Sequence, residues 1–292
     1  MREFIYVAPP SIAEALIELS GDNARPLAGG TDLLPQLREG RRHADRVVDL
    51  KRIGELTTVR RLPQGGVEIG AAASATAVAR HEAIAADYPA IAASARLLGS
   101  VQVQNRASIG GNVCNAAPSA DVVPALMCHQ ATARVASGDG WREIGLEDFF
   151  TGPGKTVLKP GELLLSLALA PAPQRSATTY LRFTPRREMD IAIAGVAVRI
   201  DLAADHTIAL TRIALAAVGP TPLRAPSAEA ILRGHRLDRE VAAAAAAAAA
   251  NDARAISDTR ASADYRRALT EVLTRRGIAA CARSLNLTWD GP

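Results

Sequence analysis

Two glycine-rich segments, about eighty residues apart, are the parts of this sequence best suited to binding a ligand. The first is Ala28-Gly29-Gly30-Thr31-Asp32-Leu33 and the second is Ser108-Ile109-Gly110-Gly111-Asn112. Adjacent glycines let backbone N–H groups approach a ligand without obstruction by side chains, and successive N–H groups in a tight turn bind anions. Two such segments could hold two phosphates, or one diphosphate from both sides. The pattern therefore predicts a dinucleotide site assembled from two parts of the fold.

Two familiar nucleotide motifs do not account for these segments. Neither one reads GxGxxG, and the chain lacks the alternation of long parallel strands and helices expected of a Rossmann fold. A third segment, Gly152-Pro153-Gly154-Lys155-Thr156, resembles the end of a P-loop, but Phe149 stands where that motif needs a glycine. Pro160 and Gly161 follow within a few residues, so a turn is predicted there instead.

The sequence offers no acid–base or metal-binding constellation. The histidines are isolated, without metal-ligand spacing, at His43, His81, His129, His206 and His235. The cysteines, Cys114, Cys128 and Cys281, show no CxxC spacing, which argues against a zinc ribbon, an iron–sulfur cluster held by this chain alone and a disulfide scaffold. We therefore expect no catalytic side chain and no metal, a reducing cytoplasmic setting, and a redox cofactor that carries its own chemistry.

Composition narrows the range of partners. The 292 residues allow two or three domains, and 48% hydrophobic with 22% charged residues suits a globular protein. The net charge of +4 comes from arginines scattered along the chain, without the basic stripe of a nucleic-acid-binding protein. The N-terminus lacks the apolar core of a signal peptide, and no uncharged apolar run reaches 18 residues. We expect neither a nucleic-acid partner nor a membrane span.

Local signals place the first glycine segment between a strand and a helix. Ser11 and Glu14 form a capping box that begins a helix. A strand is predicted at 25–28, and Thr31 is expected to cap a helix that runs to Arg38. A helix N-terminus is a natural place for a phosphate. The first segment should therefore face the ligand.

The second glycine segment is expected between helices of a second unit. A hairpin turn at Gly65-Gly66, a helix capped by Ser74 and a helix from Pro89 precede this segment. After it, the sequence predicts a helix from Asp121, a hairpin over 131–144 and a strand at 163–169.

The segment Pro171-Ala172-Pro173 is the main predicted domain boundary. Beyond it, the sequence predicts strands at 178–183, 191–201 and 208–218, and then helices at 227–233, 238–250 and 262–283. The middle strand is apolar on both faces, so both should be covered. Strands followed by helices indicate a separate α+β layer.

Taken together, these motifs resemble the FAD-binding medium subunits of molybdenum hydroxylases. This group includes the medium subunit of carbon monoxide dehydrogenase and the flavin domain of xanthine dehydrogenase. Both glycine segments take part in the resemblance. The further matching stretches are Pro118 with Asp121, Phe149-Phe150-Thr151-Gly152, Gly161-Glu162-Leu163-Leu164, and Arg182 with Arg186-Arg187-Glu188-Met189-Asp190-Ile191-Ala192.

The resemblance implies an α+β fold in which two subdomains of the vanillyl-alcohol oxidase (PCMH) type enclose FAD and a C-terminal α+β domain caps it. We place the subdomains at 1–56 and 57–173, and the C-terminal domain at 174–292. Both glycine segments would hold the pyrophosphate. The resemblance further implies that Asn115 lies near the phosphates and flavin, that Asp121 binds a sugar hydroxyl, that Leu164 packs on the adenine or flavin, and that Arg182 approaches the flavin or its phosphates.

The resemblance also implies partners. A small subunit would carry two [2Fe–2S] clusters and a large subunit the molybdopterin cofactor, in a heterotrimer or a dimer of heterotrimers. Electrons would reach FAD from the clusters and leave for oxygen, NAD⁺ or another acceptor. Cys114 is interpreted as a small apolar side chain first and a redox thiol second.

Two other functions are open from the sequence. The chain could be a stand-alone FAD-dependent oxidase with its own substrate pocket, although it lacks a plausible base. It could also be an assembly module that has lost its cofactor, although both glycine segments are intact. The substrate of a complex would lie on another chain, so this sequence does not name it.

Overall fold

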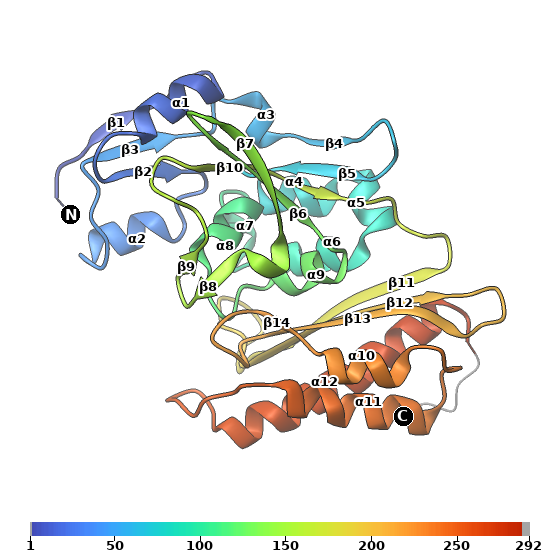
Figure 1. The fold of residues 1–292 in the computed structure, drawn as a ribbon. Coiled ribbons are helices and arrows are strands. Elements are labelled where there is room, and N and C mark those ends of the chain that lie inside the picture. The colour runs from blue at the N-terminus through green and yellow to red at the C-terminus, as the bar shows by residue number, and fades with distance from the viewer. Residues whose placement is uncertain (1, 288–292) are drawn as a thin grey trace.

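The computed structural model describes residues 2–287 and has an α+β architecture built on three main sheets (Figure 1). The N-terminal sheet and the C-terminal sheet lie at opposite ends of the molecule, with the five-stranded sheet and its helices between them. This arrangement agrees with the expected α+β fold, in which an FAD-binding portion precedes a C-terminal layer. The outermost residues of the expected divisions, 1 and 288–292, lie outside the described residues.

The first sheet is small and parallel, in the order β1-β3-β2. Its strands are β1 (Ile5–Val7), β2 (Ala24–Leu27) and β3 (Arg46–Asp49), and the helices around it are α1 (Ile12–Leu19), α2 (Leu33–Arg38) and α3 (Gly54–Thr57). Ser11 caps α1 as predicted, because its hydroxyl accepts a hydrogen bond from the N–H of Glu14. The predicted cap of α2 is wrong by one residue: Asp32 is the N-cap, and its side chain makes no capping bond.

The second sheet is antiparallel, in the order β4-β5-β10-β6-β7. Its strands are β4 (Val59–Arg61), β5 (Val67–Gly70), β6 (Thr132–Ser137), β7 (Gly140–Gly145) and β10 (Leu163–Leu169). The helices of this part are α4 (Ala75–Arg80), α5 (Glu82–Asp87), α6 (Pro89–Arg96), α7 (Val101–Gln104), α8 (Ile109–Asn115) and α9 (Val122–Cys128). A 3₁₀ turn (Leu146–Asp148) leads to the two-stranded hairpin β8 (Phe150–Gly152) and β9 (Lys155–Thr156), so the segment that resembles a P-loop is a turn, as predicted.

The third sheet is antiparallel, in the order β11-β12-β13-β14. Its strands are β11 (Ser176–Phe183), β12 (Ala194–Leu202), β13 (Ile208–Ala216) and β14 (Leu223–Arg224), followed by α10 (Pro226–Leu232), α11 (Arg239–Asp252) and α12 (Ala263–Ser284). Every residue of β12 is buried, because α12 packs on one face of the sheet and α6 and α9 pack on the other. The prediction that both faces are covered is therefore confirmed.

The sheet of the C-terminal part shares a core with the middle part. Tyr180, Ala197 and Ala214 join the cluster that is otherwise formed by residues 67–169. Burial of apolar surface is the dominant favourable term in packing, so this shared core fixes the C-terminal sheet against α6 and α9. Helix α9 in turn contacts α8, which carries the second glycine segment.

His129 lies in this shared region, at the end of α9. Its side chain is 4% exposed and meets the ring of Tyr88 edge-on, with 5.0 Å between the ring centroids. Within the described residues, Nε2 has no hydrogen-bond partner. Burial, reinforced by the positive charge of Arg199, lowers the pKa of His129 to about 3.

A pH-dependent stability follows from this histidine. In the unfolded chain His129 takes up a proton near its ordinary pKa of about 6.5, whereas the folded form stays neutral down to about pH 3. The unfolded state therefore binds more protons in this window, and His129 contributes a rise in stability with pH of up to about 1.4 kcal/mol per pH unit. We expect His129→Leu to reduce the slope of the free energy of unfolding between pH 4 and 6, measured by urea denaturation. Equal slopes in the two proteins would contradict this account.

Candidate cofactor-binding site

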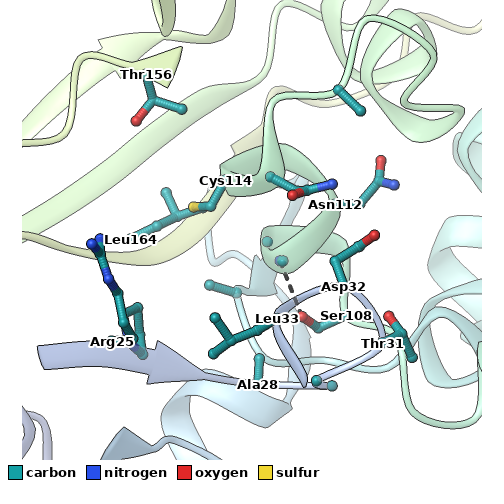
Figure 2. Close-up of a pocket in the computed structure, with 18 of the residues that line it drawn as sticks. Arg25, Ala28, Thr31, Asp32, Leu33, Ser108, Asn112, Cys114, Thr156 and Leu164 are labelled. Carbon is teal, nitrogen blue, oxygen red and sulfur yellow. Dashed lines mark hydrogen bonds between the residues drawn. The ribbon is translucent and has the colours of Figure 1, made fainter. Parts of the chain in front are cut away.

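A cavity of about 1010 Å³ lies where the three parts of the chain meet. This volume is at the upper end of the range for ligand pockets, so the cavity suits a large cofactor. Both glycine segments line it, together with residues from β10, from the β8–β9 hairpin and from the loop after β11. Figure 2 shows the chain from Ala28 to Leu33 facing Ser108 and Asn112 of the α8 region, with Cys114 and Leu164 nearby.

The first glycine segment links β2 to α2 and presents bare backbone to the cavity. Gly30 has a φ of +76°, a left-handed conformation that favours glycine. Within the described chain, the N–H groups of residues 29–33 have no acceptor, although all five residues line the cavity. Residues 29–31 and 33 are half-buried, and N–H groups in such positions require a ligand or water when they lack a protein partner. This run of donors is the strongest indication of an anion site.

Lys51 holds this segment from behind. Its Nζ donates to the carbonyl of Ala28 at 3.0 Å and to Oδ1 of Asp49 at 2.6 Å. Tyr6 donates its hydroxyl proton to the other carboxylate oxygen of Asp49. Burial raises the pKa of the Asp49 carboxyl, but the hydrogen bonds from Lys51 and Tyr6 outweigh this effect and hold the pKa below its usual value. The network holds the carbonyl of Ala28 in place and does not use the N–H groups of residues 29–33.

The second glycine segment differs from the first. It is not a free loop, because Ser108 caps α8 and the glycines occupy its first turn. The N–H groups of Ile109 and Gly110 donate to the carbonyls of Ala73 and Ala71, and those of Gly111 and Asn112 donate to the hydroxyl and carbonyl of Ser108. The expectation that both segments present free N–H groups is therefore wrong for the second one. The second segment can meet a ligand with side chains rather than with unpaired amides.

The first glycine segment contacts the two residues that immediately precede the second one. A Cβ atom placed on Gly29 would lie 2.0 Å from the carbonyl oxygen of Arg106 and 2.8 Å from the Cα of Ala107. Only glycine fits there, because real atoms do not approach a backbone carbonyl so closely. Gly110 is similarly constrained, since a Cβ there would lie 2.6 Å from the Cβ of Ala71. Glycine in both segments thus serves packing as well as ligand access.

Two asparagines of α8 supply polar side chains at the cavity. Oδ1 of Asn112 is buried and has no partner within residues 2–287, which is the expected state of a group that awaits a ligand. Asn115 is instead bonded across the cavity: Nε2 of Gln36, on α2, donates to Oδ1 of Asn115 at 3.1 Å. This bond ties the first part of the fold to the second.

Cys114 and Leu164 form an apolar part of the cavity wall. Leu164 is buried on β10 and lines the cavity. Burial raises the pKa of the Cys114 thiol to about 12, so the thiol stays protonated at neutral pH. A protonated thiol is a poor nucleophile, and this half-buried environment favours the interpretation of Cys114 as a small apolar side chain.

Two of the expected site residues do not lie on the cavity wall. Ile109 is fully buried in the core, where it anchors α8. Arg182 packs behind Asp121, to whose Oδ2 its Nη1 donates at 2.6 Å, while Tyr180 donates to Oδ1 at 2.8 Å. Asp121 does line the cavity, but both of its carboxylate oxygens already accept protein hydrogen bonds. Burial raises the pKa of this carboxyl, and Arg182 opposes the shift.

Several lining residues were not among the expected site residues. Thr151 and the turn 154–156 line the cavity, and the N–H of Gly154 donates to the carbonyl of Ala116 at the end of α8. The loop 189–191 reaches in from the C-terminal part. Thr151 and the loop 189–191 belong to motifs that carry the family resemblance, and these motifs were the signal that could have identified them. Residues 154–156 lie in the segment predicted to be a turn, and no sequence signal marked them as site residues.

Groups that would indicate other kinds of site are missing from the described residues. Residues 2–287 hold no cluster of three or more histidine, cysteine, aspartate or glutamate side chains suited to a metal ion. Among the helices described, none combines the length and apolar character needed to cross a membrane.

Comparisons with known proteins agree with this geometry. Residues 2–172 match the family model of the FAD binding domain in molybdopterin dehydrogenase, and residues 179–281 match that of the CO dehydrogenase flavoprotein C-terminal domain. The chain is 33% identical to the glyceraldehyde dehydrogenase medium chain of Sulfolobus acidocaldarius, over 96% of this chain and 99% of the relative. It is 32% identical to the carbon monoxide dehydrogenase medium chain of Afipia carboxidovorans, over 97% and 98% of the two chains.

Solved structures show the same fold. Carbon monoxide dehydrogenase from Hydrogenophaga pseudoflava superimposes with a TM-score of 0.92 at 31% identity, covering 97% of this chain and 98% of that one. Quinoline 2-oxidoreductase from Pseudomonas putida 86 gives 0.90 at 28% identity, covering 97% and 98%. The glycine-lined cavity, the two family matches and these full-length relatives agree, and the chain belongs to the FAD-binding medium subunits of the molybdenum hydroxylases.

Proposed function

We propose that this subunit transfers electrons between a partner and an external acceptor within a molybdenum hydroxylase complex. The partners would be a small subunit with [2Fe–2S] clusters and a large subunit with the molybdopterin cofactor, in a heterotrimer or a dimer of heterotrimers. Family membership supports the proposal, because the relatives are named as medium chains or FAD subunits of dehydrogenases. Three free cysteines fit a reducing cytoplasm.

The observation that carries the proposal is the unpaired N–H run of residues 29–33 in a cavity of dinucleotide size. Five adjacent donors at the start of α2 would hold a diphosphate. Positively charged side chains also line the cavity, namely Arg25, Arg42, Lys155 and Lys159. The unpaired Oδ1 of Asn112 and the side chain of Ser108 also line the cavity. These groups fit the pyrophosphate and adjacent hydroxyls of FAD.

Each remaining residue would have a positioning task. Leu164 and Cys114 would exclude water from the bound rings, and Asn115 would hold the two lobes together through Gln36. Asp121 would accept from a sugar hydroxyl at its cavity edge, while Arg182 would act through Asp121 rather than by contact. FAD, when bound, supplies the one- and two-electron chemistry itself. We assign the two lobes to residues 1–56 and 57–173, and the cap to 174–292.

Reconstitution tests this proposal. Apoprotein titrated with FAD is expected to gain a flavin absorbance spectrum and to retain the cofactor through gel filtration, whereas FMN, which lacks the diphosphate bridge, should wash out. Co-expression with the neighbouring reading frames should yield a complex that contains iron, sulfide and molybdenum. A protein that cannot take up FAD would refute the proposed site. Substrate oxidation by the isolated, FAD-loaded chain would instead establish a stand-alone oxidase.

A further inference from the structure

A second cavity, of about 390 Å³, lies beside α4, α6 and α7 and is closed by residues that follow β11. More guanidinium groups line this cavity than line the cofactor cavity. Four arginines and one carboxylate line it: Arg80, Arg96, Arg182, Arg187 and Glu188. Arg182, Arg187 and Glu188 belong to the stretch that carries the family resemblance, whereas Arg80 and Arg96 lie outside those motifs and outside the cofactor cavity.

The four guanidinium groups are incompletely paired. Nη2 of Arg96 donates to the carbonyl of Ala79, and Nη1 of Arg182 donates to Asp121. None of the ion pairs among residues 2–287 involves Arg80 or Arg187. Asp121 neutralises Arg182, so the excess positive charge comes from the exposed side chains of Arg80, Arg96 and Arg187. These like charges repel one another, and an anion that enters the cavity relieves the repulsion.

The chemistry of the wall selects for phosphate. A guanidinium presents a planar fork of N–H donors that matches phosphate oxygens in a bidentate manner. Ser100 adds a hydroxyl that makes no capping bond to α7, and the cavity volume leaves room for more than a free anion. We propose that this cavity binds the phosphate group of a small-molecule ligand carrying at least two negative charges, such as a nucleoside diphosphate.

Arg182 couples the second cavity to the first. Its side chain is only 6% exposed, lines the second cavity and contacts Asp121, which lines the first. Gly99 lines both cavities. An anion that accepts hydrogen bonds from Arg182 would weaken the ion pair between Arg182 and Asp121. This would change the electrostatic potential in the cofactor cavity. This coupling rests on the proposed function, whereas anion binding by the arginine cavity does not.

The test uses the FAD-loaded protein, so that the cofactor cavity is already filled. Calorimetric titrations at low ionic strength with ADP, inorganic pyrophosphate and adenosine report binding, and flavin absorbance is recorded at each addition. ADP is expected to bind and adenosine not to. R80Q/R187Q should weaken ADP binding by at least about tenfold, because each guanidinium contributes a charge-assisted hydrogen bond. R233Q/R275Q removes the same charge from α10–α12 and should leave the affinity unchanged.

Each outcome bears on the proposal. Equal affinity for ADP and pyrophosphate identifies a free phosphate compound as the ligand class, whereas preference for ADP identifies a nucleotide, and both support the site. A flavin spectral change on binding supports the coupling through Arg182. Absence of ADP and pyrophosphate binding, or equal weakening by R80Q/R187Q and R233Q/R275Q, overturns the site. Because FAD loading is established before these titrations begin, failure of the proposed function is recognised separately.

Discussion

Gly29→Ala is expected to weaken FAD binding by at least about a hundredfold, which corresponds to the loss of roughly two charge-assisted hydrogen bonds. The new Cβ would lie 2.0 Å from the carbonyl oxygen of Arg106, in backbone that cannot rotate away. The first glycine segment must then move off the second, and the N–H run of residues 29–33 moves with it. Fluorescence titration of apoprotein with FAD measures the effect.

Two further variants separate a local effect from a general one. Gly54→Ala introduces a methyl group into open space in the same part of the fold and should bind FAD normally. Gly111→Ala should give an intermediate loss, because its Cβ would meet only the hydroxyl of Ser108, at 2.7 Å, which can rotate. Circular dichroism checks that each apoprotein is folded. If folded Gly29→Ala binds FAD as tightly as Gly54→Ala, the contact between the two segments does not shape the site.

Asp121→Leu is expected to give the largest loss of stability, about 3–5 kcal/mol in the free energy of unfolding. The side chains of Asp121 and Arg182 are 9% and 6% exposed, and removal of the carboxylate leaves the guanidinium buried without its counter-charge. Tyr180 loses the acceptor of its hydroxyl proton at the same time. Urea denaturation of the apoprotein measures the change.

A double-mutant cycle shows whether the pair is the cause. Asp121→Leu/Arg182→Met removes both charges and should recover much of the stability lost by Asp121→Leu, since a buried pair replaced by apolar groups is often tolerated. Arg267→Ala serves as a control, because it breaks an exposed pair with Asp264 and should change little. A double variant as unstable as the sum of its parts would mean that Asp121 and Arg182 act independently.

Predictions that depended on local signals agree with the structure. The Ser11 and Ser74 caps, the hairpin β6–β7 and the strand β10 were all predicted, because caps, glycine turns and alternating apolar residues act over a few neighbours. The three C-terminal helices were found within two residues of their ends. Where the N-cap of α2 was misplaced, Thr31 and Asp32 are adjacent residues of similar capping preference.

Placement within the site was harder to predict. Ile109 stands in a glycine-rich motif, yet its side chain faces the core. Arg182 was expected near the cofactor, yet it is drawn into a buried pair with Asp121. Sequence neighbours of a binding motif need not touch the ligand, because a helix directs successive side chains to different faces.

Short-range patterns and motifs in a fixed order were enough to predict the α+β class, the family and many of the elements from the sequence, whereas the helices α7 and α8 were not predicted. Only the tertiary structure decided which backbone donors remain free. The N–H groups of residues 29–33 are unpaired, while those of residues 109–112 are bonded to Ala71, Ala73 and Ser108. Two similar glycine segments acquired different roles because hydrogen-bond partners come from wherever the chain packs, and packing joins residues far apart in sequence.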